Sequence, residues 1–172
     1  MSQLQISPPV DAQIVFIGCD HKFQPRRPAR GCESQNRELE TVIREVISEC
    51  QIRFIGEEAD EGQETLAQWI AGEAGIQYLN IDIPSSIKAA IKHRPPAEHC
   101  ELEGRQIDLT KTDPYSKAWN LVREYHMAKS VLDVLQPAKM PVLLIVGAGH
   151  VEPMIDLFQR YKLIVCPMRC IT

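Results

Sequence analysis

Ile14-Val-Phe-Ile-Gly18-Cys-Asp-His21 and Val142-Leu-Leu-Ile-Val-Gly147-Ala-Gly-His150 are the two stretches that decide the fold. Each is a short run of mostly branched apolar residues that ends at a glycine, and each has a histidine three positions after that glycine. Such runs are typical of buried parallel strands, and the glycine indicates a sharp turn at the strand's carboxyl end. Ligands of open α/β sheets bind at that edge. The sequence therefore predicts that His21 and His150 meet at one site.

The rest of the chain alternates between strand-like and helix-like patterns. Apolar residues from Leu39 to Ile47 recur at three- and four-residue spacing, which marks the buried face of a helix. Strands are expected at about 13–17, 52–56, 77–82, 142–146 and 163–166, and helices at about 34–50, 63–74, 113–135 and 151–161. This order predicts one α/β domain over residues 1–172, with a mainly parallel central sheet flanked by helices. The weakly patterned segment 84–113 is expected to form an insert or lid.

Length and charge limit the classes of function. A chain of 172 residues is long enough to bury one core without disulfides or metal. The formal net charge of −4, with both signs interspersed, excludes a basic stripe of the kind that follows nucleic-acid backbones. No apolar stretch approaches the roughly 18 residues that a membrane span needs. We therefore expect a cytoplasmic protein that acts on a small molecule or peptide, with no nucleic acid or membrane partner, and homo-oligomers remain possible.

Two adjacent glutamates follow the second predicted strand at the same edge of the sheet. Neighbouring residues at a strand end point to opposite faces, so one of Glu57 and Glu58 should face the histidines, and the sequence does not say which. The alternative for this acidic run is a solvated turn. Asp20 is either a further ligand or a turn cap, and Asp82 is expected to be an ordinary turn residue.

Two histidines and a carboxylate suit a divalent transition metal that keeps open positions for water or substrate. The expected ligands are His21, His150 and Glu58, and the expected ion is Mn, Co or Zn. Water bound to such an ion can ionise near neutral pH and become a nucleophile. The sequence thus favours a metal-dependent hydrolytic site.

Arg123 lies on the long predicted helix and is the remaining candidate for the site. A guanidinium there could clamp an anionic group of the substrate or neutralise the acidic residues. The alternative is an ion pair on the helix surface with Glu124 and Lys129. Spacing alone leaves both possibilities open.

These motifs together resemble those of the TraB/PrgY and Tiki proteins, and more distantly the erythromycin esterases and the ChaN haem-binding lipoproteins. The resemblance rests on both Gly-x-x-His motifs, the Glu57/Glu58 pair, and the segments Arg123-Glu-Tyr-His-Met127 and Val146-Gly-Ala-Gly-His150. Glu124 stands where TraB-like chains usually have Asp or Asn. The chain is also shorter than a typical member, and its middle segment is reduced.

The resemblance implies a compact α/β fold in which both histidines and one glutamate form a single pocket. Tiki proteins are divalent-metal-dependent proteases, the esterases use histidine and glutamate without needing a metal, and ChaN binds haem. By this resemblance His21, His150 and Glu57 or Glu58 would be ligands or general base, and Arg123 would contact the substrate or the glutamate. We expect a hydrolase of a peptide or ester bond. The alternative is a non-catalytic binding or signalling module that holds haem or a small anion in the same pocket.

Overall fold

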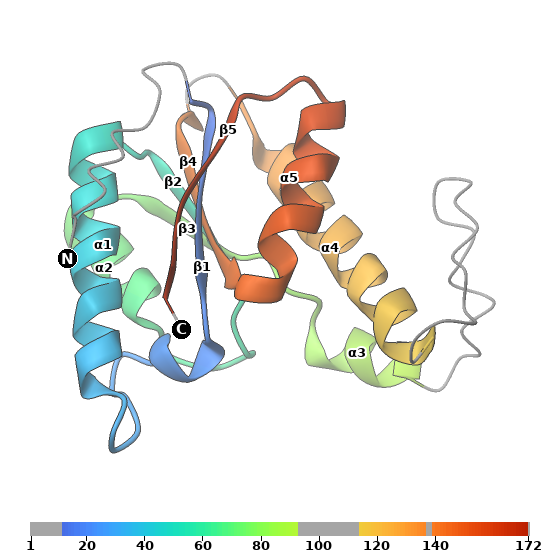
Figure 1. The fold of residues 1–172 in the computed structure, drawn as a ribbon, viewed down its shortest axis with the longest axis horizontal. Helices are drawn as coiled ribbons and strands as arrows, with labels where there is room; N and C mark the ends of the chain where they lie inside the picture. Colours follow the sequence, from blue (N-terminus) through green and yellow to red (C-terminus); the bar gives the residue numbers. More distant parts are fainter. Residues whose placement is uncertain (1–11, 93–113, 137–138, 172) are drawn as a thin grey trace.

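A computed structural model describes residues 12–92, 114–136 and 139–171, and it contains one five-stranded, all-parallel sheet (Figure 1). The strand order is β3-β2-β4-β1-β5. The strands are β1 (Ile14–Cys19), β2 (Phe54–Glu57), β3 (Gln77–Asn80), β4 (Val142–Gly147) and β5 (Val165–Ile171). The fold is therefore the single α/β layer structure that the alternation of patterns predicts.

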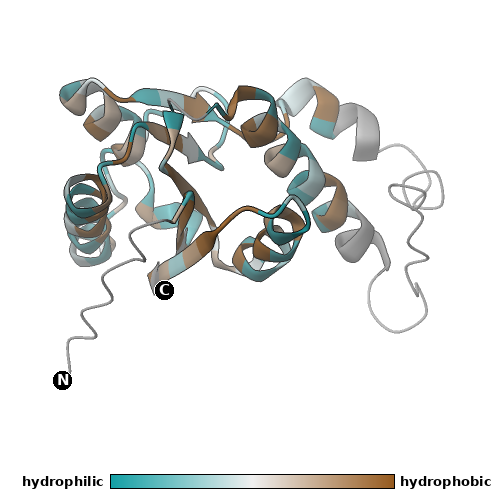
Figure 2. Cartoon of the chain, turned by 90° about the horizontal axis from the view of Figure 1, so that it is seen from above, coloured by the Kyte–Doolittle hydropathy of each residue, from teal (hydrophilic) through white to brown (hydrophobic). Residues whose placement is uncertain are grey.

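Helices cover both faces of the sheet. Helices α1 (Glu33–Cys50) and α2 (Leu66–Ala74) pack on one face, and α4 (Pro114–Val134) and α5 (Val151–Arg160) pack on the other (Figure 1). The short helices η1 (His21–Phe23), α3 (Ser85–Lys92) and η5 (Ala148–His150) complete the described elements. Viewed from above, the sheet lies between these two layers of helices (Figure 2).

Strands β1 and β4 are apolar throughout because they are buried on both sides. Val15 and Ile17 of β1 belong to the core under α1 and α2, whereas Ile14 and Phe16 belong to the core under α4 and α5. All four side chains are completely buried. A strand with a helical layer on each face needs apolar residues at every position, which explains the unbroken run.

The strand order brings the two Gly-x-x-His motifs together. Strands β1 and β4 are neighbours in register, with Gly18 beside Val146 and Cys19 beside Gly147. Strand β2 lies on the other side of β4, and the Glu58 N–H continues this ladder by donating to the Ile145 carbonyl at 2.8 Å. The carboxyl ends of β1, β4 and β2 therefore stand side by side, and their first loop residues share one edge.

The observed elements differ from the predicted ones mainly at their ends. Helix α2 begins at Leu66 because the Thr65 side chain accepts from the Gln68 N–H and caps it. Strand β5 runs on to Ile171 because it pairs with the whole length of β1. Of the predicted insert, α3 is described, and residues 93–113 lie outside the described part of the chain. No described helix combines the length and apolar character that crossing a membrane requires.

Candidate functional site

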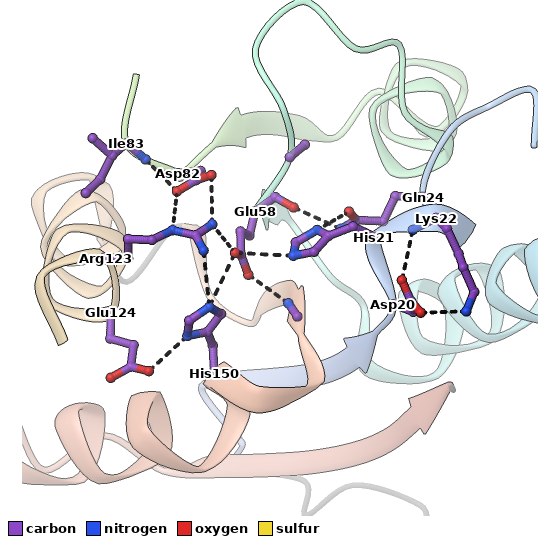
Figure 3. Close-up of polar contacts among 12 residues, drawn as sticks. Asp20, His21, Lys22, Gln24, Glu58, Asp82, Ile83, Arg123, Glu124 and His150 are labelled. Carbon is purple, nitrogen blue, oxygen red and sulfur yellow. Dashed lines mark hydrogen bonds and ion pairs between the residues drawn. The ribbon is translucent and has the colours of Figure 1, made fainter. Parts of the chain in front are cut away.

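The site is organised around one buried carboxylate, Glu58, directly after β2 (Figure 3). Its Oε1 atom lies 3.4 Å from His21 Nε2 and 3.5 Å from His150 Nε2, and it also accepts from Arg123 Nη2. Its Oε2 atom accepts from the Gly147 N–H at 2.7 Å. One carboxylate thus joins both Gly-x-x-His motifs to the long helix α4.

These neighbours keep Glu58 ionised. Burial acts to raise its pKa, but the hydrogen bond from His21, the charges of His150 and Arg123, and the Gly147 N–H together hold it at about 2. A carboxylate with no solvent exposure persists only where cations and donors surround it. Glu58 is therefore a fixed negative charge at neutral pH.

His21 is held in one orientation from both sides of its ring. Its Nδ1 atom lies 2.8 Å from Gln24 Oε1, and the Gln24 amide N–H donates to the Glu58 carbonyl at 2.9 Å, which fixes the amide. Nδ1 therefore carries a proton. The hydrogen bond with Glu58 raises the pKa of His21 to about 9, although burial acts to lower it. At neutral pH His21 is an imidazolium, and 48% of its side chain is exposed.

His150 has a carboxylate on one ring nitrogen and a guanidinium near the other. Its Nδ1 atom lies 2.9 Å from Glu124 Oε1, and its Nε2 atom lies 3.5 Å from Arg123 Nη1. A carboxylate only accepts, so Glu124 requires a proton on Nδ1. Nε2 lies 3.5 Å from a donor, Arg123 Nη1, and 3.5 Å from an acceptor, Glu58 Oε1, so these contacts fit both the neutral ring with a lone pair on Nε2 and the imidazolium. Glu124 therefore orients the ring as the carboxylate does in a catalytic carboxylate–histidine pair.

Arg123 links the glutamate to a second buried acid, Asp82. Its Nε and Nη2 atoms donate to the two oxygens of Asp82 at 3.2 and 3.0 Å, while Nη2 also contacts Glu58. The Asp82 side chain is 3% exposed. Arg123 therefore neutralises two buried carboxylates, and the ion pair with Glu124 and Lys129 on the helix surface does not form. Lys129 instead pairs with Asp133.

Gly147 lets the strand end approach the site closely. A β-carbon at this position would stand 3.1 Å from His21 Nε2 and 3.3 Å from Glu58 Oε2. Both distances are shorter than ordinary van der Waals contact. The glycine thus lets the carboxylate and the imidazole pack directly against the backbone that supplies the Gly147 N–H, and a β-carbon there would push them away by a few tenths of an ångström.

A cavity of about 290 Å³ opens beside the His21 and Arg123 side of this cluster. Its walls include His21, Asp82, Lys88, Trp119 and Arg123, so helices α3 and α4 contribute to it. Lys88 Nζ lies 2.5 Å from Asp82 Oδ2. The exposed edge of His21 therefore faces a space large enough for a small molecule.

Glu57 lies away from the histidines, on the opposite face of the sheet. Its Oε2 atom accepts from Thr65 Oγ1 at 2.5 Å and from the Tyr78 hydroxyl at 2.8 Å, and its Oε1 atom has no hydrogen-bond partner among the described residues. Burial raises its pKa to about 7, and the two hydroxyl donors lower it only in part. Of the two candidate glutamates, Glu58 is the one that faces the site.

The structure brings His21, Glu58, Arg123 and His150 together and leaves Asp20 outside. Asp20 caps η1 by accepting from the Lys22 N–H and pairs with the Lys22 ammonium at 2.7 Å. Sequence reasoning missed the roles of three residues that hold the site together: Gln24, Asp82 and Glu124. Asp82 ends a predicted strand at the same edge as the other site residues, and that position was a signal for its role. Nothing local marks Gln24.

The donor types suit a divalent metal, but their positions do not. Two Nε2 atoms and a carboxylate oxygen face one region, as a transition-metal site needs. The Arg123 guanidinium occupies that region, because it contacts Glu58 and lies 3.5 Å from His150 Nε2. In the described ranges no three His, Cys, Asp or Glu side chains are placed to hold an ion. The metal stays a prediction.

Fold and site together define a class: a single-domain α/β protein with a buried Glu–His–Arg cluster at the carboxyl edge of a parallel sheet. Comparison with family models, with curated proteins and with solved structures finds no match to this chain.

Proposed function

We propose that this protein is a hydrolase of the TraB/Tiki type that cleaves an ester or peptide bond, with histidine and glutamate rather than a bound ion activating the water. One observation carries the proposal. Both Nε2 atoms lie within 3.5 Å of the same oxygen of Glu58, a buried and ionised carboxylate. Strongly perturbed ionisable groups beside a cavity are typical of functional sites.

His150 is the general base of the proposed reaction. In the neutral form that this role needs, Nδ1 keeps its proton against Glu124 and Nε2 presents a lone pair beside Arg123 Nη1. Glu124 then stabilises the imidazolium that forms when Nε2 takes a proton from water. The water oxygen attacks the carbonyl carbon of the substrate. When the bond to the leaving group breaks, the same proton passes from Nε2 to the leaving oxygen or nitrogen.

His21 donates to the negative charge that develops on the carbonyl oxygen, and the nearby charge of Arg123 adds to its stabilisation. His21 is an imidazolium at neutral pH and lines the cavity, as Arg123 does. Both are fixed in advance by Glu58, so they need little reorganisation during the reaction. Glu58 therefore acts through the two cations and is a positioning residue in this scheme.

The test is hydrolysis of a panel of chromogenic esters and fluorogenic peptides by the purified protein and by His150→Ala. We expect His150→Ala to lower kcat by roughly 10²–10⁴-fold, the usual contribution of a general base. His126→Ala is the matched control, because His126 lies on α4 and makes no side-chain contact with Glu58. Equal rates in His150→Ala and His126→Ala would contradict the proposal.

Metal content separates the two routes to an activated water. We expect the purified protein to keep its activity after dialysis against a chelator, because Arg123 already occupies the region between Glu58 and His150. Stoichiometric Mn, Co or Zn whose removal abolishes hydrolysis would replace the histidine route by the metal-dependent one.

A further inference from the structure

Three cationic side chains from three different elements line the cavity beside the Glu58 cluster. His21 belongs to η1, Lys88 to α3 and Arg123 to α4. Lys88 and Arg123 are largely buried, with 22% and 16% of their side chains exposed. Because these cations are shielded from solvent, their hydrogen-bond donors need acceptors on the protein or on a ligand in the cavity.

The buried acceptors around them are already fully used. Asp82 Oδ1 accepts from the Ile83 N–H and from Arg123 Nε, and Oδ2 accepts from Lys88 Nζ and Arg123 Nη2. Two carboxylate oxygens offer about four lone-pair positions, so Asp82 has no capacity left. Glu58 is similarly occupied on both oxygens.

Several donors remain after this inventory. Asp82 takes one of the three N–H groups of Lys88, and within the described residues the other two have no acceptor. Arg123 Nη1 carries two N–H groups, and its contact with His150 Nε2, at 3.5 Å, uses one of them. The Nε2–H of His21 reaches Glu58 at a long 3.4 Å and can be shared with a ligand. Apart from the exposed Asp60, the polar groups on the cavity wall that can still form a hydrogen bond within the described residues are donors.

We propose that the substrate carries an anionic group, a carboxylate or a phosphate, that binds in this cavity between Lys88 and Nη1 of Arg123. Charge-assisted hydrogen bonds of this kind are about twice as strong as neutral ones, and an ammonium beside a guanidinium is a common partner for either anion. Glu58 and Asp82 hold the donors in place before the anion arrives, which limits the entropy lost on binding. The inference rests on the proposed function, because it names a feature of the substrate of that site.

The test uses sodium succinate and inorganic phosphate as probes, with sodium chloride at equal ionic strength as the blank. Binding is measured as the rise in unfolding temperature and as the shift of the His21 ring signals in NMR spectra. We expect saturable binding of at least one probe by the wild-type protein. Lys88→Met should weaken this binding about tenfold, since it removes one charged hydrogen-bond donor, and Lys88→Arg should largely retain it.

Lys129→Met is the matched control. Lys129 also lies 2.5 Å from an aspartate oxygen, but it is exposed on α4 and is not part of the cavity wall. We expect Lys129→Met to bind both probes as the wild-type protein does. Tighter binding of phosphate would assign a phosphate-bearing substrate, and tighter binding of succinate a carboxylate-bearing one.

Two results would overturn the inference: both probes behaving like chloride, or Lys88→Met binding them as tightly as Lys129→Met. The measurements need no turnover, so their outcome is separate from that of the hydrolysis assay. Anion binding without hydrolysis would keep this inference and reject the proposed reaction. Hydrolysis without a preference for acidic substrates, together with no binding of either probe, would keep the proposed reaction and reject this inference.

Discussion

Glu57 and Glu58 are neighbours in the chain and are equally buried, but their pKa values are shifted in opposite directions. Burial raises the pKa of Glu57 to about 7, whereas the donors and cations around Glu58 overcome the same effect and hold its pKa at about 2. The difference comes from the pleat of the strand, which turns one side chain toward Thr65 and Tyr78 and the next toward two histidines and an arginine. Sheet position, and not local sequence, decides which carboxylate becomes part of a site.

Glu58→Gln gives the largest expected difference between the two glutamates. The amide cannot neutralise Arg123, so a buried cation loses a partner, and we expect a loss of about 3 kcal/mol or more in the free energy of unfolding. We also expect hydrolysis to fall by roughly 10²–10³-fold, because His21 and Arg123 lose the carboxylate that holds them in place. Glu57→Gln should keep its rate within about threefold, since Glu57 contacts none of the site residues.

Denaturant unfolding and initial rates on the same preparations check this prediction. Glu58→Asp keeps the charge, and it should recover more of the stability than of the rate because the shorter side chain misplaces the carboxylate. Similar losses of stability and rate in Glu57→Gln and Glu58→Gln would mean that the two faces of the sheet do not differ in function.

Gly147 and Gly149 allow a second contrast within one loop of the Glu58 face. Gly147→Ala places a methyl group 3.1 Å from His21 Nε2 and 3.3 Å from Glu58 Oε2, while a β-carbon on Gly149 meets nothing within 4 Å. Displacing reacting groups by about 1 Å can cost about 10²-fold in rate, so we expect Gly147→Ala to lose 10–100-fold. Gly149→Ala should keep both rate and stability. If the two variants lose equal activity, close approach at Gly147 is not what the site requires.

The pH dependence of stability should have opposite slopes for the two glutamates. Between about 4.5 and 7 the folded protein keeps a proton on Glu57 that the unfolded chain has lost, so this residue makes stability fall as the pH rises. Glu58 stabilises the fold above about 4.5, and this contribution is lost as the pH falls toward 2.

Unfolding of wild type and Glu57→Gln at pH 4.5 and 6.5 isolates the Glu57 slope. We expect the wild type to lose about 2 kcal/mol relative to the variant over this range, from the roughly 1.4 kcal/mol that each pKa unit represents. His21 adds no slope here, because the stability that its raised pKa supplies is complete below 6.5 and is lost only as the pH rises toward 9. Parallel curves for the two proteins would mean that Glu57 titrates normally.

The sheet and the meeting of the histidines could be predicted because they depend on patterns within single segments. Unbroken apolar runs identified β1 and β4 as central strands, and the glycine after each run located the edge where His21 and His150 lie. The parallel order of alternating strands and helices then followed from chain connectivity. The same reasoning predicted that only one glutamate faces the histidines.

The contacts that hold the site together could not be predicted because the partners are distant in sequence. Glu124 reaches His150 only because α4 packs beside α5, and Asp82 reaches Arg123 only because β3 lies at the edge next to β2. Spacing along α4 instead suggested a surface ion pair for Arg123. Strand order and helix packing are properties of the whole chain, and no local pattern in this sequence encodes them.

Substitution of Gln24 should give the smallest and most specific effect, because its side chain contacts His21 and Glu58 on the Glu58 face of the sheet. Its amide accepts from His21 Nδ1 and donates to the Glu58 carbonyl, so Gln24→Leu removes one hydrogen bond from the imidazolium and leaves the Glu58 carboxylate in place. This hydrogen bond is stronger to the imidazolium than to the neutral ring by roughly 1 kcal/mol. NMR titration should therefore show the pKa of His21 falling from about 9 by somewhat less than one unit. Gln68→Leu, an exposed change on α2, should leave the His21 titration unchanged. If Gln24→Leu lowers stability without moving the pKa of His21, Gln24 serves packing only, and Glu58 alone raises the pKa of His21.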